Sequence, residues 1–482
     1  MMQTNLAGSR RAAILAAAFG LLSWSPLHAQ FTVTTPTGSI QTVADTAAGT
    51  LLVPYFEVDL SSPTGKNTIF TINNTGATQT VTNNGASFPN VSGPTAVLAH
   101  VVIWSDLGVP VFNFNVYLTG FDVERINMRN VLSGILPQTA SAGQDPSDLI
   151  SPKGIFSQDI NFASCNTPNG FTPPVTSYPV LPPRMNAAQV DNLVKSLTGN
   201  ASPERGFQCG GLNHFDNIAR GYVTIDTVNN CTARFPTDVG YIAAGGTGDI
   251  TNQTQLTGEV YYVDQDHLVA RSDNLVHIHA DATNPLTSTA GNYTFYGRYD
   301  NWTAADNRQP LATSFAARFL SGSFNAPAST TPLTIPFPGS PTPQTSGSSS
   351  LIVWRDSKIS QGYFACGTTP AWYPLAEEGI VAFDEQEHPQ LMGNSIFPFG
   401  PAFPAATQVV PIGGSALPVS YLSGWLYLDL NTTVTGATGP TADMAAAQAW
   451  VQVLEQNGNY FFNVMHRAQQ LDSATQASHF VP

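Results

Sequence analysis

The chain has 482 residues, of which 42% are hydrophobic and 10% are charged. This apolar content is enough to bury a core, so the composition excludes a chain that stays unfolded through charge repulsion. Removing residues 1–29 takes away two arginines and no acid, which leaves 16 basic and 32 acidic side chains and a net charge of −16. A negative protein repels phosphate on average, so the charge argues against a nucleic-acid binder.

The N-terminus has the pattern of a secretory signal peptide over residues 1–29. Arg10 and Arg11 precede an apolar run over 12–24, and a small residue, Ala29, follows it. The run is shorter than the roughly 20 apolar residues of a spanning helix, so we expect cleavage near Ala29 rather than a membrane anchor. The sequence therefore predicts a secreted protein, periplasmic or extracellular, with no integral membrane segment in the mature chain. Both the Sec route and the twin-arginine route remain open.

The four cysteines predict two disulfide bonds, because an exported chain with an even number of cysteines is usually oxidised. They are Cys165, Cys209, Cys231 and Cys366. Three pairings are possible, and the sequence does not choose among them. A zinc site is the alternative, but no CxxC pair supports it.

The local pattern predicts mostly β-strands separated by turns rich in Gly, Pro, Asn and Asp. The candidate strands cover 50–58, 67–73, 97–104, 112–118, 221–228, 258–263, 275–281, 292–299, 313–320, 350–355, 379–384, 424–430 and 449–454. Trp104 and Trp354 lie in the middle of strands, so we expect them in the core. One helix is predicted around 190–197, with Gly199 placed to end it.

The two halves of the chain resemble each other when their strands are laid over one another in order. Residues 100–106 match 350–356, and residues 221–226 match 424–429. We therefore predict an all-β protein of two tandem antiparallel β-sandwich domains with few short helices. The alternative is one large β structure that reuses similar strands.

The predicted domain boundaries follow from this repeat. The first sandwich covers 30–285 with an irregular insertion over 130–200, and the second covers 286–482. A Pro/Ser/Thr-rich loop over 321–349 separates two strands of the second domain.

A first candidate site is a metal site formed by His277, His279 and Asp281. On an extended strand, alternate residues share a face, so these side chains could converge on one transition metal. Surface-exposed or packed histidines explain the same pattern.

A second candidate site is an acidic turn with Asp384, Glu385 and Glu387, where oxygen ligands are dense enough for calcium. It lacks the spacing of an EF-hand loop, and an ordinary solvated acidic turn is the alternative. The possible cofactors are thus calcium and, with less support, a transition metal.

A third candidate site consists of the aromatic residues Trp302, Trp372 and Tyr373, which lie in predicted loops. Exposed rings stack on sugars, although the same rings could simply cover the ends of the sandwiches.

Nucleophilic catalysis has little support, because the sequence contains no GxSxG elbow, HExxH motif or phosphate-binding glycine loop. Paired carboxylates of a glycoside hydrolase would have to come from distant strands. The candidates for that role are Asp106, Asp122, Glu124, Asp356, Asp384 and Glu385.

Three segments, 51–56, 96–104 and 112–119, resemble a group of secreted bacterial β-sandwich proteins of unassigned function. The resemblance implies bacterial export and a β fold, and it transfers no functional residue. Together these features predict a non-catalytic extracellular or cell-surface protein that binds a glycan, another polymer or a protein. The alternative is a secreted metal-dependent or carboxylate-based hydrolase acting on glycans.

Overall fold

The computed structural model describes a set of segments that are mostly β-strand. They are residues 46–75, 79–83, 86–93, 97–118, 121–137, 185–200, 210–228, 232–243, 248–280, 294–299, 305–323, 346–357, 375, 377–392, 402–431, 447–457 and 462–471. Strands dominate these segments and two helices accompany them, so the predicted all-β class is confirmed. The predicted signal peptide lies outside the described residues.

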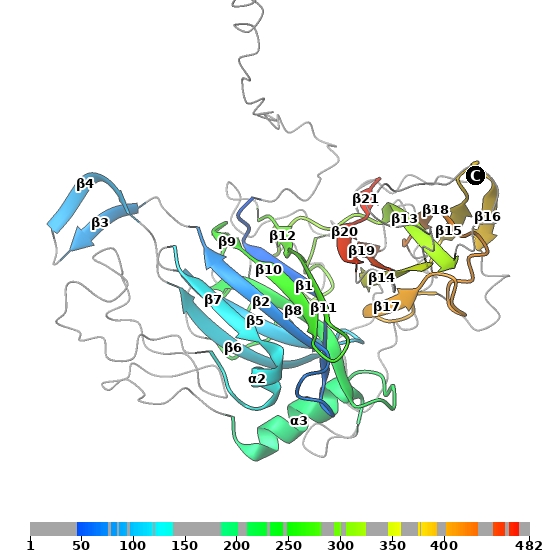
Figure 1. The fold of residues 1–482 in the computed structure, drawn as a ribbon. Coiled ribbons are helices and arrows are strands. Elements are labelled where there is room, and N and C mark those ends of the chain that lie inside the picture. The colour runs from blue at the N-terminus through cyan, green and yellow to red at the C-terminus, as the bar shows by residue number, and fades with distance from the viewer. Residues whose placement is uncertain are drawn as a thin grey trace, which may run out of the picture. The chain divides into compact units, whose positions relative to one another are not determined.

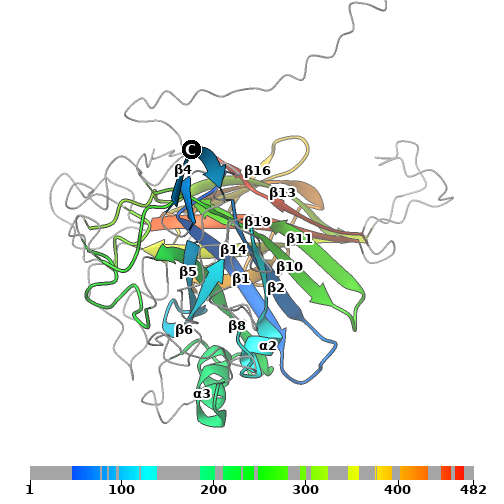
Figure 2. The ribbon, with the colours of Figure 1, turned by 90° about the vertical axis from the view of Figure 1, so that its left-hand side faces the viewer.

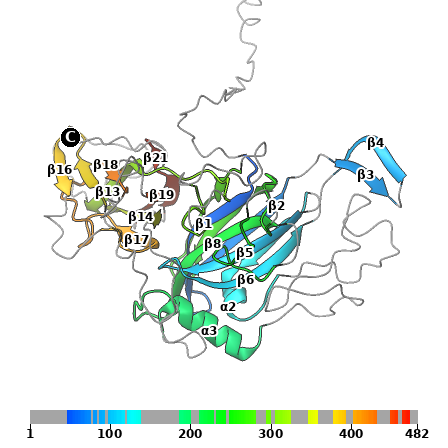
Figure 3. The same ribbon diagram turned by 180° about the vertical axis from the view of Figure 1, so that it is seen from behind.

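The first sheet is antiparallel and has the strand order β12-β1-β8-β5-β6 (Figures 1 and 3). Its strands are β1 (Thr50–Asp59), β5 (Val97–Ser105), β6 (Pro110–Leu118), β8 (Ile218–Val228) and β12 (Val276–Ile278). Every residue of β5 is buried, because Val101 and Ile103 face one core while Val102 and Trp104 face another. Burial on both faces explains why β5 reads as a continuous apolar run.

The second sheet packs face to face against the first. Its strands are β2 (Asn67–Asn74), β7 (Val123–Asn127), β9 (Leu256–Thr257), β10 (Glu259–Asp264) and β11 (Val269–Asn274), in the order β11-β10-β2-β7 with β9 beside β2. Phe70 and Val260 of this sheet share a hydrophobic cluster with Leu51 and Val53 of the first sheet. The two sheets therefore form a β-sandwich. A separate two-stranded sheet pairs β3 (Gln79–Asn83) with β4 (Ala86–Gly93).

Two short helices, α2 (Met128–Leu132) and α3 (Ala187–Thr198), contact each other and the strands of this sandwich (Figure 2). α3 begins with a capping box formed by Asn186 and Gln189, and Gly199 ends it with φ of 71°. This left-handed conformation suits glycine, so the predicted helix and its end are confirmed.

The third sheet contains nine strands and encloses its own core. They are β13 (Ser314–Ser323), β14 (Ser346–Ser357), β15 (Gly379–Phe383), β16 (Pro389–Met392), β17 (Thr407–Pro411), β18 (Ser423–Asp429), β19 (Ala447–Asn457), β20 (Phe462–Arg467) and β21 (Gln469–Gln470). β13 connects two parts of the sheet, because residues 314–320 pair with β18 and residues 321–323 pair with β14. Phe319, Val353 and Leu426 share the core between these parts.

Strands β14 and β19 are apolar on both faces. Leu351 and Val353 face the core of the third sheet, whereas Ile352 and Leu454 join the core of the first two sheets. Trp354 is 2% exposed and lies in a third cluster together with Trp104, which is 0% exposed. Both tryptophans are therefore core residues, as predicted. Hydrophobic clusters cross the predicted boundary at 285/286, and residues 40–482 form one compact unit.

The strand pairing bears on the predicted internal repeat. β5 pairs with β8, but their proposed counterparts β14 and β18 are not partners among the described strands, because β14 pairs with β13, β17 and β19. The pairing of the first half is therefore not repeated through these matches, and the duplication stays a prediction.

The strand predicted over 292–299 is wrong for the residues that the structure describes. Residues 295–299 form turns, and the backbone N–H of Tyr299 donates to the carbonyl of Tyr296. The aromatic side chains that suggested a strand are buried: Phe295 and Tyr296 belong to the third hydrophobic cluster. Burial of rings from a turn gives the same residue pattern as a strand.

Candidate ligand-binding face

Three side chains form a row across the outer face of the third sheet. Arg318 of β13 lies opposite Trp425 of β18, which lies opposite Phe383 of β15. The neighbouring residues in each strand, such as Phe319 and Leu426, point the other way into the core. Because side chains alternate along a strand, the row faces outward. Arg318 is exposed, and the two rings are partly exposed.

The two rings of this row stack. Their centroids lie 4.1 Å apart and their planes differ by 11°. Gly424, beside Trp425, has φ of 151°, and a Cβ atom there would lie 1.8 Å from the carbonyl oxygen of Phe383. A side chain at this position would collide with β15, so glycine allows the close approach of the two strands. The backbone thus holds the Trp425 ring against Phe383.

A hollow of about 440 Å³ lies beside the row. Arg318 and Trp425 line it together with Glu385, His466 and Gln469. Its volume falls within the range of small-molecule sites. The hollow combines one indole ring with one exposed cation, one exposed carboxylate and one exposed amide.

Two arginines beside the hollow, Arg467 and Arg318, differ in their contacts with other side chains. Arg467, which also lines the hollow, has Nε 3.6 Å from Oδ1 of Asp273 and its guanidinium over the ring of Trp450. Among the described residues, Arg318 has no ion-pair partner, so its five N–H donors are available to a ligand. An indole face beside such donors and acceptors can stack on a sugar ring and hydrogen-bond its hydroxyl groups.

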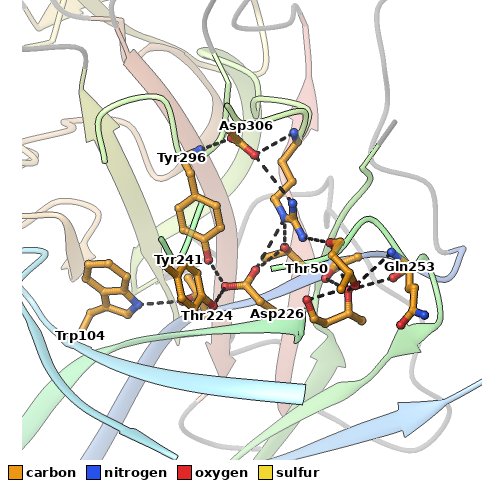
Figure 4. A network of polar contacts seen from close by, with 12 residues as sticks. Thr50, Trp104, Thr224, Asp226, Tyr241, Gln253, Tyr296 and Asp306 are labelled. Carbon is orange, nitrogen blue, oxygen red and sulfur yellow. Dashed lines mark hydrogen bonds and ion pairs between the residues drawn. The ribbon is translucent and has the colours of Figure 1, made fainter. Parts of the chain in front are cut away.

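A second polar cluster is buried in the first sheet (Figure 4). Asp226 is 0% exposed, and its Oδ2 accepts hydrogen bonds from the hydroxyls of Tyr241 at 2.6 Å and Tyr296 at 2.8 Å. Its Oδ1 accepts from Thr50 at 2.5 Å and lies 3.7 Å from Nε of Arg308. Burial raises the pKa of both tyrosines, and the Asp226 charge raises it further, so both remain neutral donors.

The other groups around Arg308 are also buried and bonded. Its Nε donates to Thr50 at 2.5 Å, and its backbone N–H donates to Asp306. Asp306 also accepts from the backbone N–H of Tyr296 at 2.8 Å. Because the side chains of the ionic groups in this network are 0% exposed, they join residues 294–299 and 305–308 to the first sheet rather than receive a ligand.

A comparable buried arginine lies in the third sheet. Arg355 is 0% exposed and donates to the backbone carbonyls of Leu375, Phe403 and Leu430. Glu377 lies 3.8 Å from this guanidinium. Burial raises the pKa of Glu377, although the Arg355 charge acts in the opposite direction. These contacts attach three loops to β14, which is a structural role.

The predicted transition-metal site is only partly described. His277 is buried in β12, and Nε2 of His279 lies 3.2 Å from the hydroxyl of Thr46. Asp281 lies outside the described residues. Within the described part of the chain, no group of three His, Cys, Asp or Glu side chains is arranged to hold a metal ion. The full triad therefore stays a prediction.

The predicted acidic turn is described completely. Oδ1 of Asp384 accepts from the backbone N–H groups of Gln386 and His388, and Oδ2 contacts the ring of His388 at 2.8 Å. Asp384 therefore closes its own turn. Glu385 instead lines the hollow, and Glu387 is exposed in the same turn with φ of 64°. Among the described residues, these carboxylates do not belong to any group of side chains that could hold a metal ion.

Several other predicted residues lie outside the described ranges. They are Trp302, Trp372, Tyr373, Cys165, Cys209, Cys231 and Cys366. Two of the carboxylates considered for hydrolysis are buried and engaged: Asp106 with His214 at 2.8 Å, and Asp356 with Arg298 at 2.9 Å. The sequence patterns did not identify Arg318, Trp425 and His466 as site residues. The sequence did contain one signal for Trp425. Side chains alternate between the two faces of the strand at 424–429, and this alternation places Trp425 on the outward face.

Comparison with protein-family models, curated proteins and solved structures found no match. In the part of the chain that the structure describes, no helix is both long and apolar enough to cross a membrane.

Proposed function

We propose that this is an exported, non-catalytic protein that binds a glycan through the outer face of the third sheet. The observation that carries the proposal is the row of Arg318, Trp425 and Phe383 beside a hollow of about 440 Å³. An indole ring held by a stacked neighbour can receive a sugar face without losing its own ordering entropy on binding. The signal-peptide pattern at residues 1–29 supports exposure to extracellular polymers.

Several features favour binding over hydrolysis. Among the described residues, Glu385 is the one carboxylate that lines the hollow, whereas glycoside hydrolysis in most families needs an acid and a second carboxylate about 5–10 Å apart. The neighbouring Asp384 accepts three hydrogen bonds inside its own turn. Charged and amide groups around an indole ring are suited to hydroxyl recognition.

The test is retention of the purified mature chain on cellulose, chitin and xylan, followed by calorimetry with oligosaccharides of the retained polymer. The variant Trp425→Ala is expected to weaken binding at least about tenfold, because it removes the stacking surface. Tyr261→Ala is the matched control, since Tyr261 is a partly exposed ring on β10 of the second sheet. Failure of all three polymers to retain the protein, or equal binding by Trp425→Ala, would contradict the proposal.

A further inference from the structure

The hollow beside Trp425 has a small side chain at its floor. Ala316 of β13 lies opposite Tyr427 of β18 on one side and opposite Gln469 of β21 on the other. Its neighbour Ala317 is buried in the core of the third sheet, so Ala316 points outward, where it is partly exposed. Because Ala316 ends in a methyl group while its cross-strand neighbours are longer, the outer face is hollowed at this position. The floor of the hollow is therefore apolar.

The walls of the hollow carry polar groups and one open ring face. Phe383 of β15 covers one face of the Trp425 ring. Because β18 lies between β15 and β13, the other face of this ring points toward β13 and the hollow. Gln469 contributes an exposed amide, and Arg318 lies two residues from Ala316 on the same face of β13. The methyl floor is thus bordered by an amide, a guanidinium and an indole face, with Cβ atoms about 5–8 Å from that of Ala316.

Building on the proposed glycan-binding function, we propose that the hollow receives the acetamido group of an N-acetylated sugar whose ring stacks on Trp425. An acetamido group combines a methyl group, a carbonyl acceptor and an N–H donor in one planar unit. Its methyl group packs on Ala316, while Arg318 donates to its carbonyl and Oε1 of Gln469 accepts from its N–H. Each polar atom of the group then has a partner when it leaves water.

Other sugars suit this hollow less well. A sugar with a hydroxyl group in place of the acetamido group lacks the methyl that packs on Ala316 and leaves part of the hollow unfilled. The deacetylated amino sugar lacks both the methyl and the carbonyl, so it loses the contacts with Ala316 and Arg318. Its ammonium group could pair with Glu385, but an exposed ion pair contributes little. The chemistry therefore favours chitin-like chains over cellulose, xylan and chitosan.

The test compares the β-1,4-linked trimers of N-acetylglucosamine, glucose and glucosamine by calorimetry on the mature chain at neutral pH. The N-acetylated trimer is expected to bind at least about tenfold more tightly than either of the others. Ala316→Val should fill the floor and reduce the affinity for the N-acetylated trimer to that for the glucose trimer. Ala270→Val is the matched control, since Ala270 is an exposed alanine on β11 that does not line the hollow.

Two further variants separate recognition of the acetamido group from stacking of the sugar ring. Gln469→Leu keeps the approximate size of the side chain and removes the amide. It should weaken the N-acetylated trimer about fivefold or more and leave the glucose trimer unchanged. Trp425→Ala should weaken all three trimers, because each of them uses the indole face.

The outcomes distinguish the acetamido site from glycan binding in general. Equal or tighter binding of the glucose or glucosamine trimer, lost in Trp425→Ala, would overturn the acetamido site and leave the glycan-binding function in place. An unchanged preference for the N-acetylated trimer in a folded Ala316→Val or Gln469→Leu variant would also overturn the site. Absence of saturable binding by all three trimers up to about 10 mM would contradict both the site and the glycan-binding function.

Discussion

The buried network around Asp226 and the outer row around Trp425 use the same kinds of residues in opposite ways. Both place an arginine beside aromatic rings and near a carboxylate. In the buried network, the side chains of Arg308 and Asp226 are 0% exposed and bond to protein groups. In the outer row, Arg318 is exposed, and water or a ligand must satisfy it. Burial therefore decides whether this combination of residues stabilises the fold or becomes available for recognition.

The largest expected loss of stability follows from a substitution in the buried network. Arg308→Met leaves the Asp226 charge buried without its cation, so we expect a loss of about 3–5 kcal/mol in the free energy of unfolding. Asp226→Asn should also destabilise the protein, because it puts an amide N–H donor where one of the two accepting oxygens lies and removes the charge that faces Arg308. Urea unfolding measures both, with Lys195→Met as the control because the pair of Lys195 and Asp191 lies at the surface. A loss for Arg308→Met as small as that of the control would contradict a structural role for the network.

The next largest effect is expected when Gly424, which lies beside Trp425 of the outer row, is replaced. Gly424→Ala places a Cβ atom 1.8 Å from the carbonyl oxygen of Phe383, so β15 and β18 must move apart. We expect a loss of about 1–3 kcal/mol in urea unfolding, together with weaker glycan binding. Gly379→Ala on β15 is the control, because no other group lies within 4 Å of the place that its Cβ atom would take. Equal stability of the two variants would show that the close approach does not matter.

A smaller, pH-dependent effect is expected at His100. Its Nδ1 lies 2.9 Å from Oδ1 of Asn115 and its Nε2 lies 3.0 Å from the carbonyl of Arg234. Burial lowers the pKa of His100, although these acceptors and the charges of Asp226 and Asp249 oppose the shift. The folded protein resists protonation that the unfolded chain accepts, so stability falls as the pH drops below the unfolded value of about 6.5.

This loss is at most about 1.4 kcal/mol per pH unit for one proton. Urea unfolding at about pH 7.5 and about pH 5.5 measures it, and His100→Gln should show a smaller difference between the two conditions. An equal decline in the variant and the original protein would assign the acid sensitivity to other groups.

The smallest effect is expected for the pair of Asp216 and Arg220, whose side chains are 37% and 16% exposed. Oδ2 of Asp216 lies 2.5 Å from Nη2 of Arg220, and this hydrogen bond lowers the pKa of Asp216 to about 2. Asp216→Asn should cost about 0.2–1 kcal/mol at neutral pH, because solvent screens the pair. The contribution is complete above the unfolded pKa of about 3.9 and is lost as the pH falls toward the folded value. Urea midpoints of the two proteins should therefore converge in acid; a constant difference would exclude the ion pair as the cause.

The sequence predicted the strands better than the sites. Trp104 and Trp354 were expected in the core because they lie inside apolar strands, and local periodicity decides that outcome. The outer row was missed because it depends on the register of β13, β18 and β15, which are distant in the sequence. Pairing between distant strands is set by tertiary packing and is not written in any one segment. The turn over 295–299 was mistaken for a strand because its rings are buried.

Strands β14 and β19 have apolar side chains on both faces, which restricts how the protein can be divided. A chain ending at residue 285 would lack Ile352 and Leu454 from its core, and the remaining half would present them to water. Exposed apolar strands promote aggregation. Dividing the chain at 285/286 would therefore expose apolar residues of both parts, so engineering should keep the three described sheets together.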